Sequence, residues 1–203
     1  MMIMNPSVQK SAARKRELGF GLIEVMVSIL ILTIGLVSML AVFSLAMAAT
    51  QTAQDDMVAK QEAREALESI FTARNTSQIN WDSIQNSATP PGIFLGGFNP
   101  ILAPGPDGLV GTADDVPDPD PSCPGPSQCL KMPGPDGKLG TADDIYMPLN
   151  NFDRQIDIQP LNDNTGNQYA GLRQVTVTIR YTTSQTRGTQ KTYTSSAYIS
   201  QYR

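Results

Sequence analysis

An uncharged apolar segment near the N-terminus restricts what this chain can fold into more than any other feature. Residues 25–49 contain no charged side chain, and the charges that bound this segment are Glu24 and Asp55. The segment is longer than the roughly 20 residues that an α-helix needs to cross a bilayer. The sequence therefore predicts one membrane-spanning helix.

The residues before this helix are basic. Residues 1–19 have a net charge of +3, because they contain one acidic residue, Glu17, and four basic residues, Lys10, Arg14, Lys15 and Arg16. Basic flanks stay in the cytoplasm, so the C-terminal part is predicted to lie outside it. The whole chain has a formal net charge of −4, which leaves −7 for the rest. Nucleic acid is not an expected partner, because phosphate binding needs a basic surface.

A cleaved secretory signal peptide is the alternative to a membrane anchor. Such peptides have an apolar core of about 7 to 15 residues that ends at small residues. The apolar run here is longer, but "LAMAAT" (residues 45–50) is similar to such a cleavage site. This alternative stays open.

Glu24 stands at the start of the apolar segment. An ionised side chain inside a membrane helix costs roughly 2.5 to 3.5 kcal/mol on insertion scales, so it indicates a cationic partner. Lys15 and Arg16 are more than one helical turn away. The partner is therefore expected from outside the helix, unless the side chain simply extends to water at the membrane boundary.

The string Gly19-Phe20-Gly21-Leu22-Ile23-Glu24, between a basic leader and an apolar helix, resembles the class III signal of type IV pilins and pseudopilins. The resemblance implies that a prepilin peptidase cleaves between Gly19 and Phe20 and methylates the new amino terminus. Glu24 would then pair with the terminal amine of a neighbouring subunit. Opposite charges 4 Å apart attract by about 4 kcal/mol at an effective dielectric constant of 20, comparable to the insertion cost.

Two features depart from the usual pattern of this family. Gly21 stands where Ser or Thr is usual, and no proline occurs between Pro6 and Pro90, whereas major pilins usually have one in this helix. The run "EVMVSILILTIGL" is more similar to the type IV pilus modification (PilV) group of minor pilins.

The anchor is expected to continue as an amphipathic helix. Ala63, Ala66, Leu67, Ile70 and Phe71 follow helical spacing. The polar faces are predicted to carry charged side chains, with ion pairs from Asp56 to Lys60 and from Arg64 to Glu68; the charged set is Lys60, Glu62, Arg64, Glu65 and Glu68.

The middle of the chain is rich in turn-forming residues and contains a duplication. Residues 86–150 hold 13 of the 15 prolines and 10 of the 16 glycines, which predicts loops. "PGPDGLVGTADDV" (104–116) recurs as "PGPDGKLGTADDI" (133–145), similar to insertions in exported bacterial proteins. Calcium prefers carboxylate and carbonyl oxygens, so the repeats are a candidate calcium site, although they lack the EF-hand pattern. Solvated Asp-Gly turns are the alternative. The candidate ligands are Asp107, Asp114, Asp115, Asp136, Asp143 and Asp144.

The two cysteines, Cys123 and Cys129, lie between the repeats. Outside the cytoplasm they are expected to form a disulfide. A zinc site is not expected, because the chain has no histidine and two thiols do not complete four ligands.

The C-terminal third has the pattern of β-strands. Residues 155–159, 172–182 and 191–202 are rich in Val, Ile, Thr and Tyr, and a hairpin turn is expected at Gly188. An antiparallel sheet that covers the amphipathic helix gives an α+β, pilin-like fold. The expected regions are a leader (1–19), a transmembrane or filament-core helix (20–49), its amphipathic continuation (50–75), a loop-rich insertion (76–151) and the sheet (152–203).

The catalytic inventory is nearly empty, because histidine, a free thiol and a phosphate-binding loop are all missing from the sequence. The resemblance therefore implies a minor type IV pilin rather than an enzyme. It would be inserted in the bacterial inner membrane with its C-terminus in the periplasm, and would later join or prime the extracellular fimbrium, with cell adhesion as a role. Its partners would be other pilin subunits, prepilin peptidase, the inner-membrane assembly platform and lipid. A type II secretion pseudopilin and a membrane-anchored, calcium-dependent adhesion protein are the alternatives.

Overall fold

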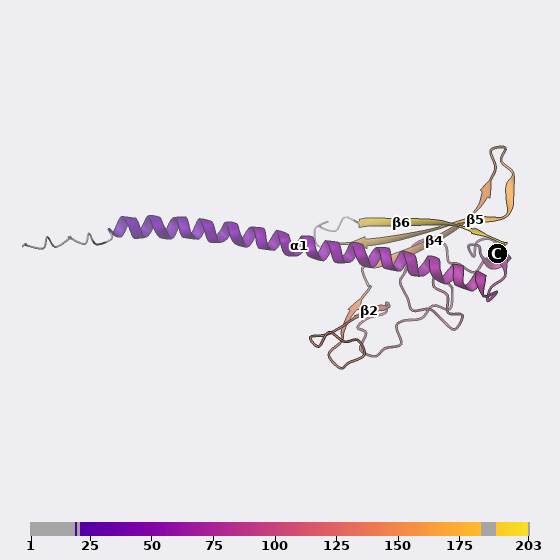
Figure 1. Cartoon of the computed structure of the whole chain (residues 1–203), viewed down its shortest axis with the longest axis horizontal. Helices are drawn as coiled ribbons and strands as arrows, with labels where there is room; N and C mark the ends of the chain where they lie inside the picture. The colour runs from indigo at the N-terminus through magenta and orange to yellow at the C-terminus, as the bar shows by residue number, and fades with distance from the viewer. Residues whose placement is uncertain (1–18, 20, 184–189, 203) are drawn as a thin grey trace, which may run out of the picture. The chain divides into compact units, whose positions relative to one another are not determined.

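The computed structural model describes residues 19, 21–183 and 190–202, and its fold is α+β. A helix, α1 (Leu22–Asn75), is followed by β-strands that form an antiparallel sheet (Figure 1). The predicted fold class is thus confirmed. Contacts divide the chain into two compact units, residues 1–46 and 47–203, which we call unit 1 and unit 2.

Unit 1 contains the apolar part of α1. All residues from 21 to 46 are exposed. One window of 18 residues in α1 has a mean hydropathy of 2.7, with none of it buried inside the protein. By length and composition this helix can cross a membrane.

Unit 2 is built on a sheet with the strand order β1-β4-β5-β6. The long strands are β4 (Phe152–Asn162), β5 (Gln168–Thr182) and β6 (Gln190–Ser200), and β1 (Asn99–Pro100) pairs with β4 at one edge. The pairing of β5 with β6 runs without a register shift from Leu172 opposite Ser200 to Thr182 opposite Gln190. The sequence pattern of alternating apolar and polar residues accounts for this sheet, because one face is buried.

The core of unit 2 lies between the sheet and the C-terminal part of α1. Val175, Val177 and Ile179 of β5 are fully buried and belong to the same cluster as Ile70. Small side chains allow the helix to approach the sheet closely, since four of the buried α1 residues are alanines: Ala59, Ala63, Ala66 and Ala73.

A smaller hairpin is formed by β2 (Cys129–Met132) and β3 (Ile145–Pro148). Within unit 2, Figure 1 shows β2 and its loops on one side of the C-terminal part of α1 and the large sheet on the other. A short 3-10 helix, η1 (Trp81–Ser83), follows α1, and the Arg173 guanidinium stacks on Trp81 at 4.4 Å from the ring centroid.

Several details differ from the sequence-based expectation. β4 begins at Phe152, three residues before the predicted strand. The earlier part was not predicted because it contains Arg154, a charged residue that faces inward. The predicted turn at Gly188 lies outside the described residues. The local ion pair from Asp56 to Lys60 was wrong: Asp56 instead accepts hydrogen bonds from Tyr181 and Lys191, both at 2.7 Å.

Two further expectations for the surface of α1 differ from the structure, namely one ion pair and the exposure of one charged residue. No ion pair links Arg64 to Glu68 within 4 Å in the described part of the chain. Glu62, predicted on a polar face, is buried, with only 2% of its surface exposed. Glu62, Ala66 and Ile70 follow one another at intervals of four residues, about one helical turn. Glu62 therefore lies on the face of α1 that packs on the sheet.

Candidate functional site

The predicted processing site lies where the described helix begins. The carbonyl oxygen of Gly21 accepts hydrogen bonds from the backbone N–H groups of Glu24 and Val25 at 3.0 and 3.2 Å, which starts the helical pattern. A Cβ atom added to Gly19 would meet no atom within 4 Å. The fold of this chain therefore does not require glycine there. Phe20 lies outside the described residues.

Glu24 lies in the first turn of α1, and its side chain is exposed. The N-terminus of a helix carries partial positive charge from its unpaired N–H groups, which favours a carboxylate at this position. Among the described residues, no Lys or Arg nitrogen lies within 4 Å of the Glu24 carboxylate. The charge is thus free to bind a cation of another chain.

Three polar side chains of the apolar helix form hydrogen bonds within the helix itself. The Ser28, Thr33 and Ser38 hydroxyls donate to the carbonyl oxygens of Glu24, Leu30 and Ile34 at 2.7 to 2.8 Å. Such bonds remove the need for a water partner. Large apolar side chains remain exposed, for example Leu22 at 81% and Phe43 at 60%. This surface needs lipid or other apolar helices to cover it.

The first repeat, residues 104–116, folds into a loop that its own aspartates stabilise. The Gly111 N–H donates to Asp115 Oδ2 at 2.7 Å, and the Thr112 hydroxyl donates to Asp114 Oδ1 at 2.6 Å. The Asp107 N–H donates to Asp114 Oδ2 at 3.3 Å. The bond from Thr112 is the main reason why the pKa of Asp114 is lowered.

The second repeat, residues 133–145, has the same hydrogen bonds. The Gly140 N–H donates to Asp144 at 2.7 Å, Thr141 to Asp143 at 2.7 Å, and the Asp136 N–H to Asp143 at 3.2 Å. The bond from Thr141 lowers the pKa of Asp143 in the same way. Both loops are also closed by an antiparallel pair, Ala103 with Val116 and Met132 with Ile145. The duplication in sequence is thus a duplication in structure.

The two copies differ in where they lie. In the first copy Leu109 and Val110 are each 1% exposed and belong to the core. The equivalent residues of the second copy are Lys138, which is exposed, and Leu139, which is 62% exposed. One copy is therefore docked against its own chain, and the other is presented to solvent.

The six candidate calcium ligands are not gathered into one cluster. In the described part of the chain, none of them belongs to a group of three ligand atoms within 4.8 Å of one another; the group that meets this criterion is Asp118, Cys123 and Cys129. Within each repeat, carboxylate oxygens already accept hydrogen bonds from turn N–H and hydroxyl groups. A calcium ion would have to replace some of these bonds, and calcium binding stays a prediction.

The two cysteines form a disulfide, as predicted. The bridged thiols are therefore not metal ligands. Asp118 Oδ2 accepts a hydrogen bond from the Cys129 N–H at 2.9 Å. The bridge joins the segment between the repeats to the start of β2.

A buried charged cluster, which sequence reasoning missed, joins α1, β4 and the first repeat. Arg154 is 3% exposed, and its two terminal nitrogens lie 3.8 Å from Glu62 Oε2 and 3.8 Å from Asp115 Oδ2. Burial raises the pKa of Glu62 to about 7, and the charge of Glu65 adds to this, while Arg154 opposes it. Burial also raises the pKa of Asp115 and lowers that of Arg154. The alternation of β4, in which residue 154 lies between two inward residues, was the signal for an inward arginine.

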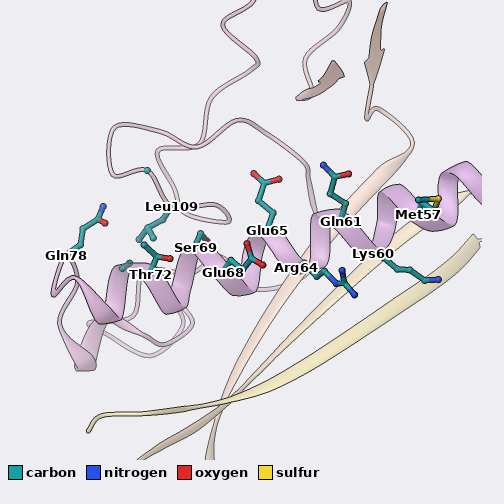
Figure 2. Close-up of a pocket in the computed structure, with 12 residues that line it drawn as sticks. Met57, Lys60, Gln61, Arg64, Glu65, Glu68, Ser69, Thr72, Gln78 and Leu109 are labelled. Carbon is teal, nitrogen blue, oxygen red and sulfur yellow. The ribbon is translucent and has the colours of Figure 1, made fainter. Parts of the chain in front are cut away.

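A groove of about 750 Å³ runs along the outer face of α1. Its other wall is the tip of the first repeat, Gly108 and Leu109, and Figure 2 shows Gln78 at that end. Lys60 and Arg64 lie toward the opposite end, and Glu65 and Glu68 lie between the two ends (Figure 2). The remaining lining residues are Met57, Gln61, Ser69, Thr72 and Ala73.

A protein-family model matches the N-terminal part of the chain. Residues 14–40 match the prokaryotic N-terminal methylation motif, and this segment includes Gly19, Phe20 and Glu24. The match supports a type IV pilin-like family, which is structural rather than enzymatic, and fits processing by prepilin peptidase and anchoring in the inner membrane. No curated protein and no solved structure matches the chain. The repeats and the sheet lie outside the matched segment.

Proposed function

We propose that this chain is a minor pilin of a type IV pilus, cleaved between Gly19 and Phe20, methylated at Phe20 and then assembled into the fibre or used to prime it. The observation that carries the proposal is the methylation motif at residues 14–40, with Glu24 exposed in the first turn of an apolar helix. Other pilin subunits, the inner-membrane assembly platform and lipid are its partners in this proposal.

The pairing of Glu24 with a neighbour's terminal amine is the physical basis of assembly. In the membrane an unpaired carboxylate is costly, and an opposite charge about 4 Å away offsets that cost. The exposed apolar surface of unit 1 would be covered by lipid before assembly and by neighbouring helices in the fibre. A helix that is apolar on all its faces suits both environments.

A type II secretion pseudopilin is the second candidate, because it shares the same N-terminal motif. The absence of proline in residues 25–49 differs from major pilins, and the run from Glu24 to Leu36 is similar to the PilV group of minor pilins. Deleting the gene separates the two candidates, since one predicts loss of pili and the other loss of secretion.

Replacing Glu24 tests the assembly role. Glu24→Gln keeps the volume of the side chain and removes its charge. We expect the variant to insert in the membrane at the normal level but to be missing from sheared surface fibres. Ser28→Ala is the matched control, since it changes a neighbouring side chain that bonds only to its own helix. Normal incorporation of Glu24→Gln into fibres would contradict the assembly role of Glu24. Absence of the unchanged protein from fibres, with its surface function retained in Glu24→Gln, would favour an anchored binding protein.

A further inference from the structure

The exposed second repeat is the starting point of a further inference. The β2–β3 hairpin loop, residues 133–144, has the same internal hydrogen bonds as the loop of residues 104–115. Both loops therefore have the same hydrogen-bonded backbone conformation. What differs is the pair of residues at each tip and the surface that faces it.

The first loop shows that this conformation packs well against protein. Its Leu109 and Val110 are 1% exposed, and the side-chain amide of Gln78 donates to the carbonyl oxygen of Asp107. A Cβ atom on Gly111 would lie 2.5 Å from Ile156 Cδ1, so the loop backbone lies directly on β4. The tip of this loop also forms one wall of the groove along α1.

The second loop presents an apolar and a cationic side chain to solvent. Leu139 is 62% exposed, Lys138 is exposed, and Ile145 at the base of the loop is 53% exposed. Asp136 and Asp143 place negative charge beside this tip, and both are exposed. The loop thus offers both apolar and charged side chains for contact with another protein.

The groove along α1 has charges that match this tip. Glu65 and Glu68 lie near its centre, and Lys60 and Arg64 lie toward one end (Figure 2). None of these four side chains forms an ion pair within 4 Å among the residues that the structure describes.

We propose that the β2–β3 hairpin loop of one copy of this chain docks into the α1 groove of a second copy. Lys138 meets Glu65 and Glu68, Leu139 enters the groove between α1 and the tip of the first repeat, and Asp136 and Asp143 face Lys60 and Arg64. Because the hairpin and the groove are different surfaces of unit 2, the contact is heterologous and can repeat from copy to copy. The contact needs only two copies of the chain and does not depend on the proposed function.

Cysteine crosslinking in the membrane tests the contact. Two full-length forms with different affinity tags are co-expressed, one with Lys138→Cys and the other with Thr72→Cys in the groove, and treated with a short bismaleimide. The native cysteines do not react, because they are bridged. The control pair replaces Lys138→Cys with Thr194→Cys, which is exposed on the outer face of the sheet. We expect several-fold more doubly tagged dimer from the first pair.

Charge reversal gives a second readout. For this readout the hairpin cysteine is placed at the exposed Ala142 instead of Lys138, so that Lys138 keeps its charge. We expect Lys138→Glu in that copy and Glu68→Lys in the groove copy each to lower the crosslink yield by about threefold, as for exposed ion pairs, and the pair of reversals to restore it. Equal crosslinking of the test and control pairs would overturn the proposal. Crosslinking of Lys138→Cys to a different membrane protein, with no doubly tagged dimer, would also overturn it.

Discussion

The carboxylate of Glu62 on α1 and the guanidinium of Arg154 on β4 lie 3.8 Å apart, and each side chain is 2% exposed. This distance is too long for a hydrogen bond, and neither Glu62 Oε2 nor Arg154 Nη1 has another partner among the described residues. Asp115 adds a second acid beside the same arginine. If all three are ionised, one negative charge is left uncompensated inside unit 2, which is costly.

We predict that this cluster makes stability depend on pH. The pKa of Glu62 is raised to about 7 from 4.5, so the folded state binds its proton more tightly than the unfolded state. The free energy of unfolding should therefore fall as pH rises from about 4.5 to 7, by up to about 3 kcal/mol. Glu62→Gln should remove the Glu62 part of this slope and leave the part due to Asp115 and Asp55, whose pKa values are also raised by burial. Chemical denaturation of the protein in detergent, monitored by the fluorescence of Trp81 at each pH, measures the slope.

Glu68→Gln is the control for this experiment, because Glu68 is exposed on the same helix. It should keep the slope. The acids with lowered pKa values, Asp56, Asp114 and Asp143, lose their stabilising effect at lower pH and do not interfere in this window. A slope of unchanged size in Glu62→Gln would contradict the assignment to Glu62.

Removing the arginine should be more damaging than removing the acid. Arg154→Met leaves Glu62 and Asp115 buried without a cation, and breaking a buried pair in this way costs about 3 to 5 kcal/mol. The loss should be smaller at pH 5 than at pH 8, because Glu62 is protonated at the lower pH. Chemical denaturation at both pH values checks this, and an equal loss at the two would argue against ionised partners.

Two glycines allow peptidase recognition to be separated from folding. Gly19→Val places a side chain where no atom lies within 4 Å, so the chain itself should tolerate it. We expect the variant to accumulate in the membrane as the uncleaved precursor. Gly21→Ser is the control, since a Cβ there makes only an ordinary contact with Ile23 at 3.9 Å. Immunoblotting shows both forms, and normal cleavage of Gly19→Val would refute the assignment of the site.

Calcium binding by the repeats is tested by measuring the heat of binding in a calorimetric titration and the melting temperature of the protein. If the aspartates bind calcium, millimolar calcium should raise the melting temperature of the full chain, because a ligand that binds only the folded state stabilises it. Asp136→Asn with Asp143→Asn should reduce the effect without disturbing the core, since both residues are exposed. The absence of a heat of binding, together with an unchanged melting temperature on calcium addition, would contradict the calcium hypothesis. The repeats would then be hydrogen-bonded turns only.

The sequence was sufficient for those parts of the fold that depend on local pattern. The uncharged run predicts the apolar helix, and the alternation of Val175, Val177 and Ile179 predicts a strand with one buried face. The resemblance at Gly19 to Glu24 agrees with the matched motif. The structure adds that the two repeated strings have the same hydrogen bonds, which is consistent with turn residues that determine their own geometry.

The charged residues were harder to place, since their partners are distant in the sequence. Asp56 bonds to Tyr181 and Lys191, more than 100 residues away, rather than to Lys60 one turn along. Surface pairs on a helix are worth only a few tenths of a kcal/mol, so a partner on the sheet outweighs them. β1 was also missed, because a strand of two residues has no periodicity to detect.

The most direct test of the central claim, processing and methylation at the start of the apolar helix, is mass spectrometry of the protein purified from its native membrane or fibre. The account predicts an amino terminus at Phe20, heavier by one methyl group on the nitrogen. A terminus at Met1, or one produced by cleavage near residues 45–50, would contradict it.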